Sequence, residues 1–411
     1  MFNSAYYKNS ELAKELSVSP VTIGRYIEQS IVNGDLDIVL INNKPKIKKT
    51  EYNLELLKRL TTNESRFKNK GVISYITTKE ELYKVFDNKE ILEILKNLDG
   101  QRHIPIKYAY LCNPLDVWPN YRDSDEDTLL NQKKSLIDNL NDQIKYIEDI
   151  IESKKVKINI IQVGPSYNSI SKNFVDYFIN KELVNCYITV GMNQAVLDLE
   201  EALICQKLDK SKVKKINYDF EKSYCKEFIF EELNLLRNSE EKTINLFICV
   251  GANLSNYISY SKIIEAISDI SIEDDLLVYD LVMFHNELMY ISNFQKGSSR
   301  YKFLTRIPDL LGFEKSKIIL NTSYNPDNSV RSIYFELLED TELTFDMLYP
   351  NKKIVNKFLK GEKIYLMYTK LTNFVYDYEM LQKKSYRMVK ATVSHNEKFL
   401  TITAKKTKKI Y

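Results

Sequence analysis

The strongest constraint on the fold is an alternation of short apolar runs with helix-forming segments, which begins near residue 155. The runs are residues 156–163, 187–190, 215–218, 244–250 and 276–281. Runs of this kind are typical of strands that are buried on both faces of a sheet. Helical segments between them serve as crossover connections, which join parallel strands. The sequence therefore predicts an α/β fold built on a parallel sheet.

A helical pattern comes directly before the first of these runs. Apolar residues recur at helical spacing at Leu129, Leu136, Leu140, Ile144, Ile147 and Ile151. This spacing predicts one long amphipathic helix packed on the sheet. A coiled coil is the alternative, but it would need three clean heptads, which the segment lacks.

The first 62 residues have a different pattern, with two short helices in succession. Ser19 is a good N-cap, and Pro20 has no N–H to leave unsatisfied at the first helical position. The expected core is Leu12, Ala13, Leu16, Val18, Ile23 and Ile27. The outward side of the second helix is expected to carry Ser19, Thr22, Arg25 and Tyr26. These four side chains are candidates for contact with base edges in a DNA major groove.

A hairpin is expected after these helices. Residues 36–41 are strand-like, 42–45 have turn chemistry, and 46–49 return, while a helix at 52–60 is expected to close the domain. Lys44, Lys46 and Lys48 would face phosphates. The segment, with ELAKELSVSPVTIGRYI, resembles the winged helix-turn-helix domains of bacterial transcriptional and plasmid regulators. The resemblance implies DNA binding, and the alternative is a small domain used for protein contact.

Composition narrows the other classes of partner. Lys and Arg total 59 against 56 for Asp and Glu, so no global field favours nucleic acid or a membrane surface. The five cysteines form no CxxC pair, and Cys186 and Cys249 have the context of buried strand residues. The three histidines are far apart, so no metal site is expected. No apolar run suits a membrane helix. We expect a cytoplasmic chain with reduced thiols and a frayed basic end at residues 405–409.

The apolar runs carry a series of motifs in a fixed order. VGPSY follows the first run at a sharp strand-to-helix turn, and VGMNQAVLDLEEAL, INYDF and LFICVGANLSNYI come later, with IPIKYAYL and LDVWPNY upstream. Residues 100–405 thereby resemble the histidine-specific S-adenosylmethionine-dependent methyltransferases, which trimethylate the histidine α-amine in ergothioneine biosynthesis. The resemblance implies a Rossmann-like class I methyltransferase domain at 129–411 with an added α+β substrate-side part. Residues 63–128 would be a linker and a substrate-side helical segment, after a winged helix-turn-helix domain at 1–62.

The resemblance also implies a cofactor and a set of site residues. S-adenosylmethionine would be bound by Gly164, Pro165, Ser166, Asp219, Phe220, Gly251 and Asn253. A small amino-acid-like ligand would be bound by Asn256, Tyr290, Tyr108 and Tyr334. Each group also has a simpler interpretation, in which Asn256 caps a turn, Asp219 is a first-turn acid of a helix, and the tyrosines are core aromatics.

Departures from the family pattern bear on activity. Gly191 ends the second strand, where a carboxylate normally accepts both ribose hydroxyls, so cofactor binding is expected to be weakened. Tyr334 stands near the position of the family's pocket carboxylate. The favoured hypothesis is a DNA-binding regulator whose C-terminal domain is a pseudoenzyme or metabolite sensor. The alternative is an active N-methyltransferase for an amino acid or related amine. A regulator of this kind is compatible with a homodimer that reads two half-sites.

Overall fold

The chain forms two compact units in the computed structural model. One comprises Met1–Cys112 and Tyr290–Met367, called here the first unit, and the other comprises Asn113–Met289 and Tyr368–Tyr411, called the sheet unit. The units do not follow the consecutive order of the segments expected from the sequence. The structure describes residues 6–33, 36, 38–41, 44–50, 53–54, 57–58, 73–112, 127–165, 170–218, 229–234, 242–251, 254–256, 260–283, 298–346, 354–372 and 374–408. None of the helices in these ranges is long and apolar enough to span a bilayer.

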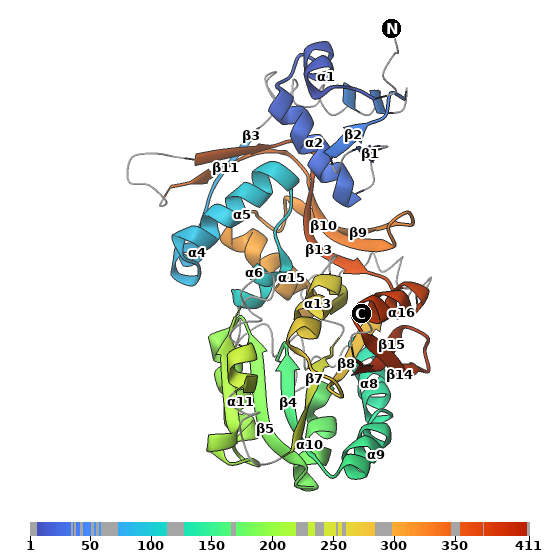
Figure 1. The fold of residues 1–411 in the computed structure, drawn as a ribbon. Coiled ribbons are helices and arrows are strands. Elements are labelled where there is room, and N and C mark those ends of the chain that lie inside the picture. Colours follow the sequence, from blue (N-terminus) through green and yellow to red (C-terminus); the bar gives the residue numbers. More distant parts are fainter. Residues whose placement is uncertain are drawn as a thin grey trace. The chain divides into compact units, whose positions relative to one another are not determined.

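The sheet unit is built on seven strands in the order β14-β15-β8-β7-β4-β5-β6 (Figure 1). Their bounds are β4 Lys157–Val163, β5 Val184–Gly191, β6 Val213–Asn217, β7 Thr243–Cys249, β8 Leu276–Val282, β14 Tyr386–Val393 and β15 Phe399–Lys406. The five strands from β8 to β6 pair in parallel, and β15 runs antiparallel to both neighbours. The five predicted apolar runs are confirmed as these parallel strands. The order reverses between β4 and β7, the position where doubly wound sheets bind ligands.

Helices cover both faces of this sheet. Their bounds are α10 Lys172–Asn180, α11 Gln194–Ile204, α13 Tyr260–Ile270 and α16 Phe374–Lys383, with short 3-10 turns η2 Lys210–Lys212 and η3 Leu254–Asn256. Ile188 of β5 lies in one core with residues of α13 and α16. On the opposite face, Tyr187 and Thr189 donate hydrogen bonds to Glu200 of α11 at 2.8 and 2.7 Å. Successive residues of the strand therefore face different helices, as the pleat requires.

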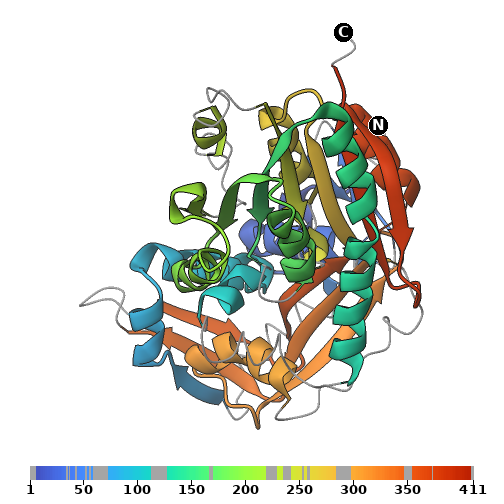
Figure 2. The same ribbon diagram turned by 90° about the horizontal axis from the view of Figure 1, so that it is seen from below.

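The expected single long helix before the sheet is wrong, because two helices replace it. They are α8 Asp127–Asn141 and α9 Ile144–Lys154 (Figure 2). Gln143 lies between them, fully buried, and bonds to two different strands. Its Nε2 donates to Thr392 Oγ1 of β14, and its Oε1 accepts from Thr403 Oγ1 of β15, each at 2.8 Å. This polar anchor fixes the break at a position that apolar periodicity cannot detect.

A chain of amide side chains crosses the sheet at the start of its strands. Asn185 Nδ2 donates to Asn159 Oδ1 at 2.8 Å, and Asn159 Nδ2 donates to Asn245 Oδ1 at 3.0 Å. Asn245 Nδ2 then donates to Asp275 Oδ2 at 3.0 Å. Because Asn159, Asn245 and Asp275 are buried, each bond satisfies a group that would otherwise be costly, and the chain links β5, β4 and β7 to the residue that precedes β8.

Part of the predicted frayed basic end is ordered, because Lys405 and Lys406 belong to β15, whereas Lys409 lies outside the described residues. Lys406 lies in β15 and is only 4% exposed. Its Nζ donates to the carbonyl oxygens of Ser268 and Lys384 at 3.0 and 2.9 Å, and it lies 4.8 Å from the centre of the Tyr386 ring. The ammonium group is thus part of the interior.

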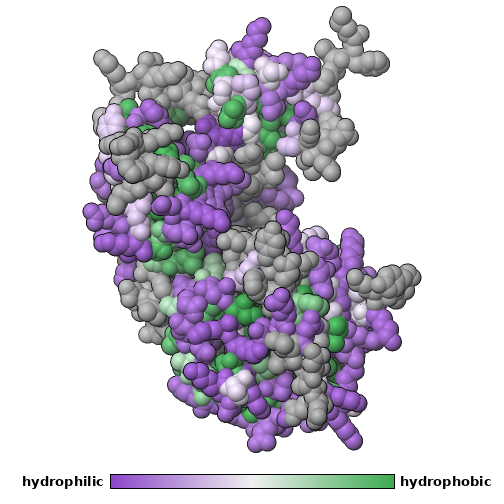
Figure 3. All heavy atoms as spheres, turned by 60° about the vertical axis from the view of Figure 1, so that its left-hand side comes forward, coloured by the Kyte–Doolittle hydropathy of each residue, from purple (hydrophilic) through white to green (hydrophobic). Residues whose placement is uncertain are grey.

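The first unit contains two three-stranded sheets, β13-β10-β9 and β12-β11-β3, in which β3 is parallel to β11. The strands are β3 Ile73–Thr77, β9 Ile318–Asn325, β10 Val330–Leu337, β11 Asp340–Phe345, β12 Ile354–Phe358 and β13 Lys363–Lys370. The helices are α4 Glu80–Val85, α5 Asn88–Gln101, α6 Ile106–Leu111 and α15 Ser299–Leu310. Among the residues that Figure 3 colours by hydropathy, hydrophilic side chains predominate on this face, with hydrophobic residues between them.

The N-terminal part of the first unit, called the head, consists of α1 Asn9–Glu15, α2 Pro20–Asn33 and an antiparallel hairpin of β1 Ile38–Ile41 and β2 Lys44–Ile47. Its core contains Leu12, Ala13, Ile23 and Ile27, with Leu16 and Val18 packed against it. Of the expected closing helix at 52–60, the described residues 53, 54, 57 and 58 are helical. Whether the head is a winged helix-turn-helix domain stays a prediction.

Candidate functional site

The backbone of Gly164 holds the turn after β4 in place through two hydrogen bonds. Gly164 adopts a φ of +83°, a value that glycine accepts without strain. Its N–H donates to the Val190 carbonyl of β5 at 2.9 Å, and its carbonyl accepts from Gln162 Nε2 at 3.2 Å. Gln162 was not among the predicted site residues. The only signal for it was a polar residue near the end of the first apolar run.

The end of β5 is closed against the residue after Gly164. A Cβ atom built on Gly191 would lie 2.7 Å from Cδ and 2.8 Å from Cγ of the Pro165 ring. Real Cβ contacts are essentially never this short, so a side chain at Gly191 would force the ring to move. The ring of Pro165 therefore lies where a side chain at this position would begin. A carboxylate side chain at position 191, the kind that usually binds ribose at this edge, would therefore collide with Pro165.

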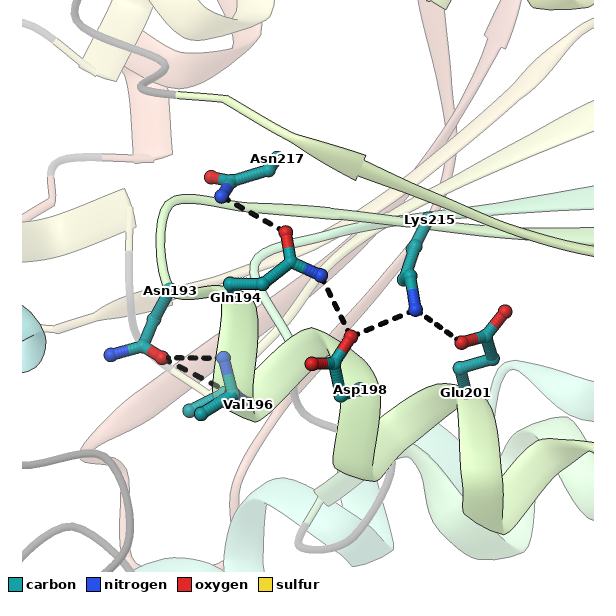
Figure 4. A network of polar contacts seen from close by, with 8 residues as sticks. Asn193, Gln194, Val196, Asp198, Glu201, Lys215 and Asn217 are labelled. Atoms are coloured by element: carbon teal, nitrogen blue, oxygen red, sulfur yellow. Dashed lines mark hydrogen bonds and ion pairs between the residues drawn. The ribbon is translucent and has the colours of Figure 1, made fainter.

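Polar side chains beyond Gly191 bond mainly to one another (Figure 4). Asn193 Oδ1 accepts from the Ala195 and Val196 N–H groups at 3.1 and 3.2 Å and so caps α11. Asn217 Nδ2 donates to Gln194 Oε1 at 3.1 Å. The Asn193 side chain thus caps α11, and the bond between Asn217 and Gln194 connects β6 to the first turn of this helix.

The same network continues along α11 through one lysine. Lys215 Nζ donates to Asp198 at 2.8 Å and also to Glu201 (Figure 4). The hydrogen bond from Lys215, with a second from Gln194, holds the pKa of Asp198 below its ordinary value. Asp198 and Glu201 of α11 are thus both engaged by Lys215.

A buried acid organises the turn after β7. Gly251 N–H donates to Asp280 Oδ2 of β8 at 2.8 Å, and Asp280 is 1% exposed. Ser255 Oγ accepts from the Val282 N–H at 2.8 Å, which ties η3 to the end of β8. Asn256, predicted to bind substrate, ends η3 and is half-buried. Asp280 was missed, although a lone acid in LLVYDLV was a signal for it.

Two of the predicted substrate residues lie in the first unit, whereas the predicted cofactor residues belong to the sheet unit. Tyr108 is fully buried, with its ring 5.4 Å from that of Phe86. Tyr334 is 7% exposed, and its ring centre lies 5.5 Å from that of Tyr365 and 4.8 Å from Lys363 Nζ. Both side chains have the surroundings of core aromatics. Five predicted site residues lie outside the described part of the chain: Ser166, Asp219, Phe220, Asn253 and Tyr290.

The head presents a surface that differs from the expected one. Tyr26 was expected to face outward, but it is only 6% exposed, and burial raises its pKa. The aromatic ring belongs to the head core, so the outward placement is wrong. The Arg25 guanidinium carbon lies 5.1 Å from the centre of this ring.

The other predicted contact residues of the head are more accessible. Ser19 Oγ accepts from the Thr22 N–H at 3.1 Å and lies 3.0 Å from Thr22 Oγ1, which confirms Ser19 as the N-cap of α2. On the hairpin, Lys46 is half-buried and Lys48 is exposed. Lys44 is the first residue of β2, and its side chain is not among those that the structure describes.

Cysteines and metal-type ligands offer little chemistry in the parts of the chain that the structure describes. Cys186 and Cys249 are buried as predicted, and burial raises the pKa of the Cys186 thiol to about 11. Thiols with raised pKa values are poor nucleophiles at neutral pH. Across those same ranges, no group of three or more His, Cys, Asp or Glu residues could hold a metal ion.

Comparison with known proteins gives weak similarity to methyltransferase structures. No family model and no curated protein matches the chain. Magnesium protoporphyrin IX methyltransferase from Synechocystis PCC 6803, with bound SAH, is 7% identical with a TM-score of 0.40 over 74% of this chain and 98% of that one. The CcbJ methyltransferase from Streptomyces caelestis is 7% identical with a TM-score of 0.35, over 61% and 83%. Human N-acetylserotonin methyltransferase, with SAM, is 9% identical with a TM-score of 0.31, over 98% and 88%. TM-scores of this size carry no argument about function.

Proposed function

We propose that this protein is a DNA-binding regulator whose sheet unit is a methyltransferase-like pseudoenzyme or metabolite sensor. The pseudoenzyme proposal rests on the contact between Pro165 and Gly191. The ring of Pro165 occupies the place where the Cβ of a ribose-binding Asp or Glu at position 191 would lie. A ligand bound at this edge would have to be held without that carboxylate. We therefore derive no methyl-transfer step for this chain.

The proposed DNA-binding role rests on the head. A capped 14-residue helix, α2, is followed by a hairpin that carries Lys46 and Lys48. Neither lysine forms an ion pair with a carboxylate in the described residues, so their charge is available to phosphate groups. This combination favours double-stranded DNA over a neutral protein surface.

The DNA-binding proposal is tested by fluorescence anisotropy with duplexes selected from a random-sequence library. Binding should weaken linearly on a plot of log affinity against log salt, and each phosphate contact adds about 0.9 to the slope. Changing Lys46 and Lys48 to Gln should reduce the slope by about two, since two contacts are lost. Lys262→Gln, an exposed lysine of α13, is the matched control and should leave the slope unchanged. An unchanged slope in the double variant would contradict the assignment.

The pseudoenzyme proposal is tested by isothermal titration of the full chain with S-adenosylmethionine and S-adenosylhomocysteine. We expect no binding of either compound in the micromolar range, because the ribose would lack its usual acceptor. Micromolar binding would overturn this half of the proposal. It would direct the next experiment to a screen of amino acids and related amines for methyl acceptance.

The alternative function is an active S-adenosylmethionine-dependent N-methyltransferase for an amino acid or related amine. It is favoured by one observation, the half-buried Asn256 at the end of η3, the next described element after β7. Doubly wound sheets bind ligands at this edge, so an amide here could hold a substrate carboxylate. Asn256→Ala would then raise the KM of any methyl acceptor found in the screen.

A further inference from the structure

A buried cluster of polar side chains lies in the sheet unit near the carboxyl end of β8. Tyr260 begins α13 and donates its hydroxyl to Asp377 Oδ1 of α16 at 2.5 Å. Burial, and then the Asp377 charge, raise the pKa of Tyr279 of β8. The Thr372 side chain lowers the pKa of Tyr260 by hydrogen bonding, while the Thr372 N–H donates to the Val282 carbonyl at 2.8 Å. Side chains from β8, α13, α16 and the segment before α16 therefore meet at one place.

Three oxygen atoms of this cluster have no hydrogen-bond partner among the described residues. They are Asp377 Oδ2, Tyr279 OH and Thr372 Oγ1. Asp377 and Tyr279 have no exposed surface, and Thr372 is 7% exposed. Native proteins rarely leave buried polar atoms unpaired, because each one has lost its water without gaining another partner. The cluster thus has the features of a site that a further group completes.

The charge of the cluster indicates which kind of group this is. When Asp377 is ionised it brings a negative charge into the interior, and the side chains that act on it or on its partners are Tyr260, Tyr279, Tyr376 and Lys370. Burial raises the pKa of both Tyr260 and Tyr279, so these phenols are neutral at physiological pH. Burial also raises the pKa of Asp377 more than Tyr260 and Lys370 lower it. The negative charge is therefore not fully compensated by its surroundings.

The donor atoms fit a small cation with a single charge. All of the unpartnered atoms are oxygens, which suit hard cations and also accept hydrogen bonds from an ammonium ion. Divalent cations are usually held by several carboxylates or keep much of their water. Among the described residues, no group of three or more His, Cys, Asp or Glu could hold a metal ion, and this cluster has one carboxylate. Its charge matches a monovalent cation.

We propose that Asp377, Tyr279 and Thr372 bind a small monovalent cation, such as Na⁺, K⁺ or ammonium, between α13, α16 and β8. The cation neutralises the buried carboxylate and joins the first turns of α13 and α16. It competes with a proton for Asp377, so the site fills only when the carboxyl group is ionised. In a buffer that contains only bulky cations, the pH dependence is the one that burial alone produces. The inference does not depend on DNA binding or on the fate of the cofactor site.

The test is differential scanning calorimetry of the full chain at pH 8 in equal concentrations of four chloride salts. Three contain Na⁺, K⁺ or ammonium, and the fourth contains tetramethylammonium, which is too bulky for a buried site. In at least one small-cation salt, at about ten times its Kd, the midpoint of the sheet unit should be about 3–6 °C higher than in tetramethylammonium. This gain should disappear toward pH 5, because the pKa of Asp377 is about 7 and a proton then occupies the carboxylate.

Variants distinguish this site from a general effect of salt. Asp377→Asn should give the same midpoint in all four salts. Tyr279→Phe removes a hydroxyl that no described residue binds, so its midpoint in tetramethylammonium should not fall. The salt concentration that gives half of the gain should rise about tenfold in this variant, because one ligand atom is lost. Glu379→Gln, an exposed acid on α16, is the matched control and should keep the full gain.

Two results would overturn the inference. One is an equal midpoint in the four salts at every concentration of a series, which would leave the proton as the partner of Asp377. The other is a difference between salts that persists in Asp377→Asn, because the cation would then bind elsewhere. The DNA-binding and cofactor titrations are separate measurements, so failure of this inference and failure of the proposed function are distinguishable.

Discussion

Replacing Asp377 by asparagine should change how the stability of the sheet unit depends on pH. Asp377 lies on α16 with no exposed surface. Tyr260, the first residue of α13, donates its hydroxyl to Asp377 Oδ1 at 2.5 Å, while Oδ2 has no hydrogen-bond partner among the described residues. Tyr279 of β8, Tyr376 of α16 and Lys370 are further titratable groups that interact with this pair. The carboxyl group is therefore buried with one oxygen unsatisfied.

Burial raises the pKa of Asp377 from 3.8 to about 7, although the Tyr260 hydrogen bond and the Lys370 charge both lower it. Between these two values the folded chain holds a proton that the unfolded chain has released. The stability contributed by this proton is complete below a pH of about 4 and is lost as the pH rises to about 7. At 1.36 kcal/mol per pH unit, the full loss is about 4 kcal/mol, an upper bound.

The assay is differential scanning calorimetry between pH 5 and 8.5, because two units can unfold in separate transitions. Asp377→Asn keeps an acceptor for Tyr260 and never ionises, so it should raise the midpoint of the sheet unit at pH 8 by at most about 16 °C. The gain should shrink steadily toward pH 5. Glu379→Gln, an exposed acid on the same helix, is the control and should change neither value. A gain for Asp377→Asn that is equal at pH 5 and pH 8.5 would refute the reasoning.

Three further substitutions test other parts of the structure. Gly191→Ala should destabilise the sheet unit by about 1–3 kcal/mol in calorimetry, because its Cβ would meet Pro165 at 2.7 Å. Adding Pro165→Ala should recover most of that loss, and a strictly additive double variant would argue against the contact. Asn159→Ala should cost about 2–3 kcal/mol in urea unfolding, since it leaves buried amide groups of its neighbours unsatisfied; a change below 0.5 kcal/mol would mean that the amide chain contributes little. Ser19→Ala should cost about 1 kcal/mol and speed hydrogen exchange in the first turn of α2, whereas Ser19→Asp should preserve the cap.

The parallel strands could be predicted because the evidence for them is local. A strand that is buried on both faces must be almost wholly apolar, so β4, β7 and β8 were visible as runs in the sequence. Ser19 was also predictable, because an N-cap depends on residues within the same turn. The order of strands and the antiparallel insertion of β15 were not, since both depend on pairings between distant segments.

The candidate site shows the same limit more sharply. The sequence predicts that Gly191 stands where an acid is usual, but it could not predict that a Cβ at Gly191 would meet the ring of Pro165. Asp280 was overlooked because its partner, the Gly251 N–H, is brought to it only by the pairing of β7 with β8. The spacing of residues in the sequence does not indicate which buried acid accepts a hydrogen bond from a distant N–H group.

What the sequence by itself determined is the class of fold, the sites of its parallel strands and the capped helix of the head. These follow from hydrophobic periodicity and from contacts within a single turn. Only the tertiary structure decided that Tyr26 and Lys406 are interior and that the helix before the sheet breaks at Gln143. Tyrosine and lysine combine an apolar body with a polar tip, so local sequence does not decide whether they are buried. A buried ammonium group also needs hydrogen-bond acceptors, which only the fold supplies. Its place is set by whichever distant acceptors or rings the fold brings next to it.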